Sequence, residues 1–250
     1  NYNLKNFSEL GVAPQFIKAL TDKKILVPTE IQEKSIPYLL SIGSDFIGQA
    51  PTGTGKTAAF GLPLLNFVNH KVPKIQALIL CPTRELCLQI AGDLSDYSKY
   101  IDNLRVLPVY GGSSIESQIK SLKRGVQIIV ATPGRLIDLI NRRTVELSNV
   151  KYVVLDESDE MLNMGFKEDI ETILERTPDS RRTMLFSATM PKEIAMIARK
   201  YMKNFEEITV GTKNSGSENV EHIYYVSQAK QRYLVLKRIV DLNPDIYGIV

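Results

Sequence analysis

Ala50-Pro51-Thr52-Gly53-Thr54-Gly55-Lys56-Thr57, residues 50 to 57, is the stretch that decides the fold class of this chain. It follows an apolar run typical of a strand and opens a run typical of a helix, which is where a phosphate-binding loop lies. Glycines at 53 and 55 let the backbone present N–H groups to phosphates, Lys56 can reach the terminal phosphates, and the Thr57 hydroxyl can bind Mg²⁺. The segment therefore predicts a nucleoside triphosphate site, although Ala50 stands where the general pattern has Gly. A Gly- and Thr-rich connection without a ligand is the alternative.

An acidic segment about a hundred residues further on completes the predicted site. The β-branched run 150–155 has the character of a buried parallel strand, and it ends in Asp156-Glu157-Ser158-Asp159. Asp156 would hold Mg²⁺ and Glu157 would orient or deprotonate the attacking water, because phosphoryl transfer needs charge neutralisation and an in-line nucleophile. Taken alone, such acids are also typical of a helix N-cap or a solvated turn. Together with the loop at 50–57, they predict that Lys56, Asp156 and Glu157 are catalytic.

Strand-like and helix-like segments alternate along the chain, which predicts an α/β fold. Parallel strands connected by helices form a mostly parallel sheet with helices on both faces and ligands at the carboxyl ends of the strands. The expected strands are 45–49, 77–81, 105–110, 126–131, 151–155, 183–186 and 207–210. The expected helices are 58–69, 84–100, 115–124, 134–142, 166–176 and 192–202.

The polar segment 211–221 has the Gly- and Ser-bearing composition of a linker. After it the alternation restarts, with a strand expected at 222–227, a helix at 229–242 and a strand at 247–250. We therefore expect one domain over 1–210 and the start of a second over 222–250.

Composition and charge are those of an ordinary globular protein. Of the 250 residues, 44 % are hydrophobic and 24 % are charged, and the formal net charge is +3. This charge permits a polyanionic partner without arguing for one. Cys81 and Cys87 fit neither a disulfide framework nor a zinc spacing, so we expect them to pack as small apolar residues. The first residues lack a signal pattern, and no apolar run approaches the roughly 18 residues of a membrane span. The chain is expected to be cytoplasmic, with no membrane partner.

Four short segments follow other predicted strands and could contact phosphate or sugar groups. Threonine, glycine and arginine at strand-to-helix junctions offer N–H groups, a hydroxyl and a fixed positive charge. Each segment taken alone is also typical of a turn or a helix N-cap. The segments are Pro82-Thr83-Arg84-Glu85-Leu86, Gly111-Gly112, Thr132-Pro133-Gly134-Arg135-Leu136 and Ser187-Ala188-Thr189.

In this order, the segments resemble the motifs of the DEAD-box family of ATP-dependent RNA helicases over the whole of 1–250. Phe7 and the run 28–32 resemble the adenine-reading Q motif, and 50–57 resembles the phosphate loop, with the family's own Ala at its first position. Segments 82–89, 111–112, 132–136, 156–159 and 187–189 are similar to motif Ia, the GG motif, motif Ib, the acidic box and the Ser-Ala-Thr motif. Two positions depart from the family pattern: Ser158 stands where the family has Ala, and Ile25 stands where it usually has an aromatic residue.

The resemblance implies a RecA-like domain and a role for each matching residue. ATP and Mg²⁺ are the implied cofactors, and single-stranded and short duplex RNA are the implied partners of a protein expected to be a monomer. Gln32 would read adenine, Phe7 would pack nearby, and Asp159 would hydrogen-bond toward Ser187 and Thr189 to link the nucleotide to domain closure. The implied nucleotide-binding residues are Phe7, Ile25, Thr29, Gln32, Ala50, Pro51, Thr52, Gly53, Thr54, Gly55, Lys56 and Thr57, with Thr57 and Asp156 as metal ligands. The implied RNA path is Pro82, Thr83, Arg84, Gly111, Gly112, Thr132, Pro133, Gly134, Arg135, Gly165 and Phe166.

Two functions remain open from the sequence. The first is an RNA-stimulated ATPase that binds single-stranded RNA and locally separates short duplexes. The second is a non-catalytic or partner-dependent nucleotide-binding module. A DNA helicase of the same superfamily is disfavoured by Gln32 and the acidic box.

Overall fold

The computed structural model describes residues 6–41, 43–211, 223–244 and 248. The chain divides into two units, residues 1–213 and residues 214–250. The first contains the sheet and all the predicted motifs. The predicted linker lies, from residue 212 onward, outside the described residues, as does most of the strand expected at 247–250.

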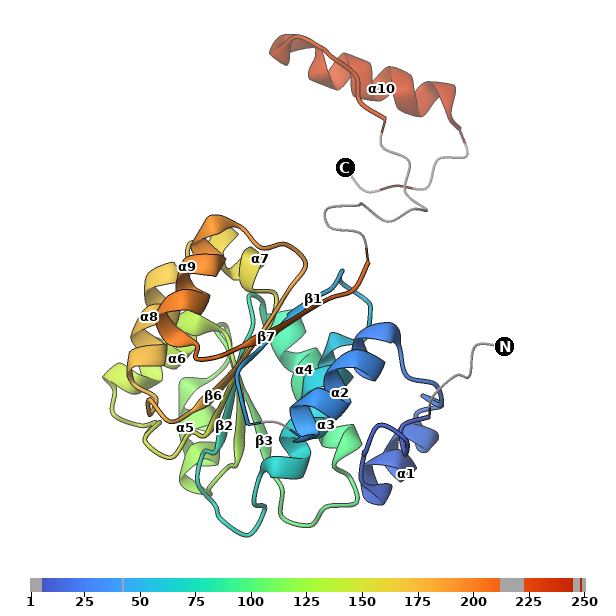
Figure 1. The fold of residues 1–250 in the computed structure, drawn as a ribbon. Coiled ribbons are helices and arrows are strands. Elements are labelled where there is room, and N and C mark those ends of the chain that lie inside the picture. Colours follow the sequence, from blue (N-terminus) through green and yellow to red (C-terminus); the bar gives the residue numbers. More distant parts are fainter. Residues whose placement is uncertain (1–5, 42, 212–222, 245–247, 249–250) are drawn as a thin grey trace. The chain divides into compact units, whose positions relative to one another are not determined.

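The first unit is built on a seven-stranded parallel sheet with the order β3-β4-β2-β5-β6-β1-β7 (Figure 1). This confirms the predicted fold class. Each strand expected in this unit is present within two residues of its predicted bounds, and β1, β2, β4 and β6 are buried over their whole length because helices cover both faces. The strands are β1 Phe46–Gln49, β2 Ala77–Leu80, β3 Val106–Val109, β4 Ile128–Ala131, β5 Tyr152–Leu155, β6 Arg182–Ser187 and β7 Glu206–Thr209.

Two apolar cores form because side chains alternate across each strand. On β2, Ile79 contributes to one core while Leu78 and Leu80 contribute to the other. Helices α1 to α4 cover the first face and α5 to α9 cover the second (Figure 1). Their bounds are α1 Pro14–Asp22, α2 Glu30–Ser41, α3 Lys56–Phe67, α4 Arg84–Tyr97, α5 Ile115–Lys123, α6 Pro133–Asn141, α7 Ser158–Asn163, α8 Lys167–Glu175 and α9 Lys192–Tyr201. Cys81 and Cys87 are buried in the first core.

The sequence patterns do not predict three of these helices, α1, α2 and α7. Helix α2 contains Pro37 in its interior, which interrupts the expected periodicity. Helix α7 has only six residues, which leaves too few turns for a clear apolar repeat, and α1 is not among the predicted helices although it is as long as α5, α6 and α8. Their formation depends on packing against the rest of the unit.

The second unit consists, in its described part, of a 3₁₀ turn, Ala229–Gln231, and helix α10, Arg232–Leu242. The strand predicted from residue 222 is wrong for the described residues 223–227, which are irregular. A strand needs a neighbouring strand to satisfy its backbone groups, and the described part of this unit offers none. None of the described helices is long and apolar enough to span a membrane.

Candidate nucleotide site at the carboxyl edge of the sheet

The order of the strands brings three predicted motifs to one place. Strands β5, β6 and β1 are neighbours in the sheet, and each ends in one motif: 156–159, 187–189 and 50–57. All three strands are parallel, so their carboxyl ends meet at the same edge. The Ala50 amide donates to the Ser187 carbonyl over 3.0 Å, which fixes the beginning of the phosphate loop to the end of β6.

The loop 50–57 turns back on itself at two glycines. Gly53 has φ +80° and Gly55 has φ +89°, a left-handed conformation that favours glycine. Helix α3 begins directly afterwards at Lys56, so its first N–H groups point toward the loop. This is the geometry of an anion-binding helix N-terminus preceded by a cradle of amides.

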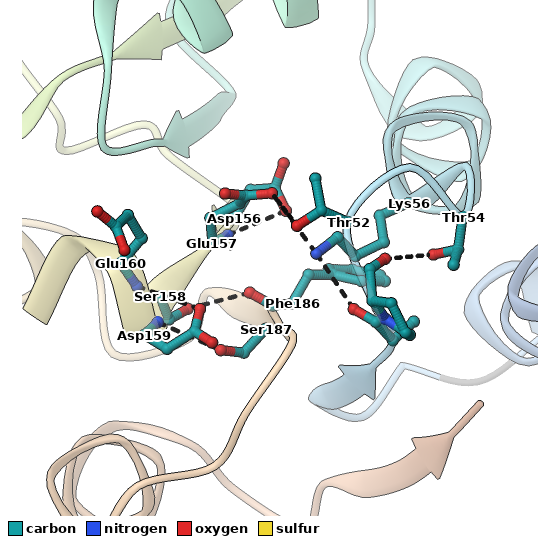
Figure 2. Close-up of polar contacts among 12 residues, drawn as sticks. Thr52, Thr54, Lys56, Asp156, Glu157, Ser158, Asp159, Glu160, Phe186 and Ser187 are labelled. Carbon is teal, nitrogen blue, oxygen red and sulfur yellow. Dashed lines mark hydrogen bonds and ion pairs between the residues drawn. The ribbon is translucent and has the colours of Figure 1, made fainter. Parts of the chain in front are cut away.

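Lys56 and Glu157 face each other across the site. The Lys56 ammonium, on a side chain only 6 % exposed, lies 3.3 Å from the Ala50 carbonyl and 3.8 Å from Glu157 Oε1. The Thr52 hydroxyl donates to the same Glu157 oxygen over 3.1 Å (Figure 2). Glu157 has φ 51° and ψ 50°, a strained conformation for a residue with a side chain. The turn therefore aims this carboxylate at the phosphate loop.

Asp156 is the buried acid of the site. Burial raises the pKa of its carboxyl to about 7, against the lowering effect of the nearby Lys56 ammonium. Asp156 and the Thr57 hydroxyl are oxygen donors of the kind that Mg²⁺ prefers, and Mg²⁺ commonly takes one or two protein oxygens together with substrate phosphates. The described residues contain no cluster of three or more His, Cys, Asp or Glu side chains suited to a metal ion. The donor set fits Mg²⁺ bound together with a nucleotide.

Asp159 connects the acidic segment to the loop after β6. Its Oδ2 accepts hydrogen bonds from the Thr189 amide over 2.9 Å and from the Thr189 hydroxyl over 2.8 Å. Its own amide donates to Ser187 Oγ over 3.2 Å. Burial opposes ionisation, but hydrogen bonds from Thr189 and Ser187 outweigh it and lower the pKa of the Asp159 carboxyl.

The predicted adenine-side residues lie beside the phosphate loop. Gln32 is buried, and its amide accepts from the Thr29 amide over 3.0 Å and donates to the Gly55 carbonyl over 2.9 Å. A base contact by Gln32 would therefore share or replace these bonds. Ile25 is partly buried against the first core, and Phe7, at 3 % exposure, is a core residue. Phe7 thus supports this region by packing and offers no surface to a ligand.

Sequence reasoning missed two apolar side chains next to this region. Leu26 is 61 % exposed and Val27 is 51 % exposed. They lie between Ile25 and the start of the Q-motif-like segment at residue 28. Their exposure, which no sequence pattern reports, makes them available to an apolar ligand surface.

Most residues of the predicted RNA path lie at the carboxyl ends of β2, β3 and β4, which are also neighbours, whereas Gly165 and Phe166 lie between α7 and α8. The Arg84 guanidinium lies 5.0 Å from the centre of the Tyr110 ring. Arg135 Nη1 donates over 3.1 Å to the Ser113 carbonyl and over 3.1 Å to Gln118 Oε1. Tyr110 and Gln118 thus position the two arginines, and sequence reasoning missed both because neither belongs to a recognisable motif.

The remaining residues of the predicted path occupy helix starts and turns. Thr83 is the N-cap of α4 and accepts from the Leu86 amide over 3.2 Å, so its capping role is present. Thr132 is the N-cap of α6, with Pro133 and Gly134 in the first turn. Gly112 and Gly165 have φ +79° and +84°. Pro82 and Gly111 lie in the connections after β2 and β3, and Phe166 packs partly buried against the second core.

Comparison with known proteins agrees with this arrangement. The family described as DEAD/DEAH box helicase matches residues 29–197. "ATP-dependent RNA helicase CshA" of Listeria monocytogenes is 47 % identical over 99 % of this chain and 47 % of its own length. The protein of the same name from Limosilactobacillus reuteri is 48 % identical over 96 % of this chain and 48 % of its own length. The chain thus spans about half the length of the curated relatives it matches.

Solved structures show the same fold. A DEAD box protein from the hyperthermophile Methanococcus jannaschii superposes with a TM-score of 0.79 and 43 % identity, covering 97 % of this chain and 65 % of that one. A hypothetical ATP-dependent RNA helicase from Sulfolobus tokodaii gives a TM-score of 0.72 and 39 % identity, covering 78 % and 56 %.

Proposed function

Because this chain belongs to the DEAD/DEAH box helicase family, we propose that it is part of an ATP-dependent RNA helicase. The proposed activity is RNA-stimulated ATP hydrolysis with binding of single-stranded RNA and local separation of short duplexes. One observation carries the proposal: neighbouring strands β5, β6 and β1 bring the acidic segment, the Ser-Ala-Thr segment and the phosphate loop into one hydrogen-bonded site.

The phosphate loop and α3 would bind the triphosphate. Amides of residues 52–57 would donate to the phosphates, and Lys56 would exchange its contacts with Glu157 and the Ala50 carbonyl for the terminal phosphates. Gln32 and Thr29 would contact the adenine, and the Gln32 side chain would share or replace its bonds with the Thr29 amide and the Gly55 carbonyl. Ile25 and the exposed Leu26 would supply apolar surface where the family usually has an aromatic ring.

Glu157 is the proposed group that orients the attacking water. Its carboxylate is freed for this when the phosphates take over Lys56 and Thr52, both of which it now contacts. Asp156 and Thr57 would hold Mg²⁺, which supplies charge neutralisation at the phosphates when bound. A bound cation would also keep Asp156 ionised despite the burial that raises its pKa to about 7.

RNA would lie across the ends of β2, β3 and β4. Arg84 and Arg135 are held in place by Tyr110 and by Gln118, so their charges are positioned for phosphates before RNA arrives. Contacts of this kind go to the backbone and carry little sequence information. Asp159, through Thr189 and Ser187, is the proposed link between the nucleotide and the loop after β6.

The proposal is tested by ATP turnover of the whole parent protein with and without single-stranded RNA, with single-stranded DNA of the same length as the control. We expect RNA to stimulate turnover and DNA to stimulate it much less. Glu157→Gln should lower kcat by at least about a hundredfold while ADP still binds. Equal stimulation by DNA, or normal turnover in Glu157→Gln, would contradict the proposal. Binding of ADP without any turnover would favour the non-catalytic nucleotide-binding module, and failure to bind any adenine nucleotide would favour a degenerate module with a structural role.

A further inference from the structure

Ser158 is a fully buried serine between two residues of the candidate site. It is the first residue of α7, with 0 % of its surface exposed. Its hydroxyl lies 3.2 Å from the Leu155 carbonyl. It also lies 3.3 Å from the Phe186 carbonyl (Figure 2). A hydroxyl has one hydrogen, so this hydrogen is shared between the two acceptors.

The contact with the Phe186 carbonyl joins Ser158 to a distant part of the sequence. A serine at a helix start commonly bonds to a carbonyl three residues back, and the contact with Leu155 is of that kind. Phe186 lies on a different strand, 28 residues away in sequence. The hydroxyl therefore bridges the end of β5 to the end of β6.

Both neighbours of Ser158 hold defined positions in the site. Glu157 holds a left-handed conformation, which a residue with a side chain keeps only when its surroundings fix it. Asp159 makes the contacts with Ser187 and Thr189. These Asp159 contacts are partly open to water, whereas the Ser158 hydroxyl is buried and its bond has no competing water.

We propose that Ser158 is a positioning residue whose hydroxyl, by bridging to the Phe186 carbonyl, holds the acidic turn against β6. The bridge keeps Glu157 in its strained conformation and sets how strongly nucleotide binding is transmitted to Ser187 and Thr189. The first half of this inference, that Ser158 positions the acidic turn, does not rest on the proposed function. The second half, that it affects transmission to Ser187 and Thr189, does. The backbone ladder between β5 and β6 ends at the Leu155–Leu185 pair, so beyond it an alanine at position 158 leaves the Asp159 contacts to hold the acidic turn against β6.

Native-state hydrogen exchange on the 250-residue protein tests the first half. The variant is Ser158→Ala, and the matched control is Ser98→Ala. Ser98 is also buried and its hydroxyl also contacts two carbonyls, those of Leu94 and Ser95, but both belong to its own helix α4. Each variant should melt about 2–4 °C lower, because each loses one buried hydrogen bond.

Only Ser158→Ala should speed exchange at the Asp159 and Thr189 amides, by about tenfold. Ser158→Cys, which keeps a weak donor of similar size, should give an intermediate rate. If these amides exchange at the unmutated rate in Ser158→Ala while its melting temperature falls as in the control, Ser158 has a local role and the proposal is wrong.

Adding ADP and Mg²⁺ tests the second half. Titration should give an ADP affinity in Ser158→Ala within about threefold of the unmutated protein, because the hydroxyl is buried and contacts only the Leu155 and Phe186 carbonyls. Nucleotide should slow exchange at the Thr189 amide in the unmutated protein and in Ser98→Ala, but not in Ser158→Ala. An identical nucleotide effect in Ser158→Ala, or none in an unmutated protein that binds ADP, would overturn the transmission role. If the unmutated protein binds no nucleotide, the proposed function fails, while the comparison without nucleotide still decides whether Ser158 positions the turn.

Discussion

At the scale of single residues, burial of Asp156 makes the folded protein less stable near neutral pH and gives the site a carboxylate suited to a cation. Its carboxyl is fully buried and its pKa is raised to about 7 from an ordinary 3.8. The folded protein therefore binds a proton that the unfolded chain has released, between about pH 4 and about pH 7. Stability from this residue is fully present below about pH 4 and is lost as the pH rises toward about 7. Above that pH, the folded protein holds a buried charge suited to a cation.

Asp156→Asn should remove the loss of stability that the buried Asp156 charge causes as the pH rises. The amide oxygen can still accept from the Glu157 amide, which now donates to Asp156 Oδ1 over 3.1 Å. Without Mg²⁺ or nucleotide, the variant should be more stable by about 1–3 kcal/mol near pH 8, or roughly 2–8 °C in melting temperature, and by less near pH 5. Thermal melts at both pH values measure this. A stabilisation that does not grow with pH would show that the charge of Asp156 is not the cause. ATP turnover should be lost in the same variant.

Gln32 joins the base side of the site to the phosphate side. Gln32→Ala removes the acceptor of the Thr29 amide and the donor to the Gly55 carbonyl, so ADP binding should weaken by about tenfold or more. The matched control is Gln127→Ala, which removes an equally buried amide bonded to Arg105, His70 and Asn103. It should lower stability and leave ADP affinity unchanged in a titration. Equal binding of GDP and ADP by the unmutated protein would contradict the adenine-reading role.

At the scale of elements, the start of α3 depends on how closely the loop approaches α2. A Cβ at Gly55 would lie 2.4 Å from Gln32 Nε2 and 3.2 Å from Thr29 Oγ1, whereas a Cβ at Gly53 would meet nothing within 4 Å. Both glycines have positive φ, so both substitutions carry similar backbone strain. Comparing the two substitutions therefore separates the effect of backbone strain from the effect of close packing against Gln32.

Gly55→Ala should lower the free energy of unfolding by about 3 kcal/mol, and Gly53→Ala by about 1 kcal/mol. Denaturant unfolding without nucleotide measures both values. Equal losses in the two variants would mean that the loop does not depend on its contact with Gln32.

The RNA-side segments illustrate how one residue can serve an element and a site together. Thr83 caps α4 with its hydroxyl, while the adjacent Arg84 lies over Tyr110. The alternative interpretation of Thr83 as an N-cap is therefore correct, and the proposed RNA role adds to it. The cap fixes where α4 begins, and so fixes where Arg84 points.

At the scale of the whole molecule, we propose that 1–210 is a RecA-like domain and that 222–250 begins a second one. In the family that this chain resembles, arginines of the second domain meet the charge on the γ-phosphate, and such a finger is worth about 10³ to 10⁵ in rate. The phosphate loop and both acids all lie within the first unit.

Residues 1–250 assayed alone should therefore bind ADP with Mg²⁺ but hydrolyse ATP close to background. RNA binding should be weak and should fall as salt is added, because only part of the phosphate contacts is present. Calorimetric titration with ADP and a phosphate-release assay measure the two halves of this prediction. Rapid RNA-stimulated hydrolysis by residues 1–250 would show that these residues suffice and that the second domain is not required.

The sequence by itself determined the fold class and predicted where a ligand would bind. The phosphate loop, the acidic segment after 150–155 and the strand–helix alternation are local signals, because each depends on the conformation of a few consecutive residues. The expected contact partners of Asp159 also followed from the resemblance. The irregular stretch 223–227 was mispredicted because its local pattern reports strand propensity and not the presence of a pairing partner.

Only the tertiary structure decided which segments meet. The neighbourhood of β5, β6 and β1 follows from the strand order, which no local pattern encodes. Gln32 meets Gly55 across 23 residues, Arg135 meets Gln118 across 17, and Ser158 meets Phe186 across 28. Such contacts are fixed by packing of the whole unit, because burial leaves each polar group in need of a partner that only the folded chain can supply.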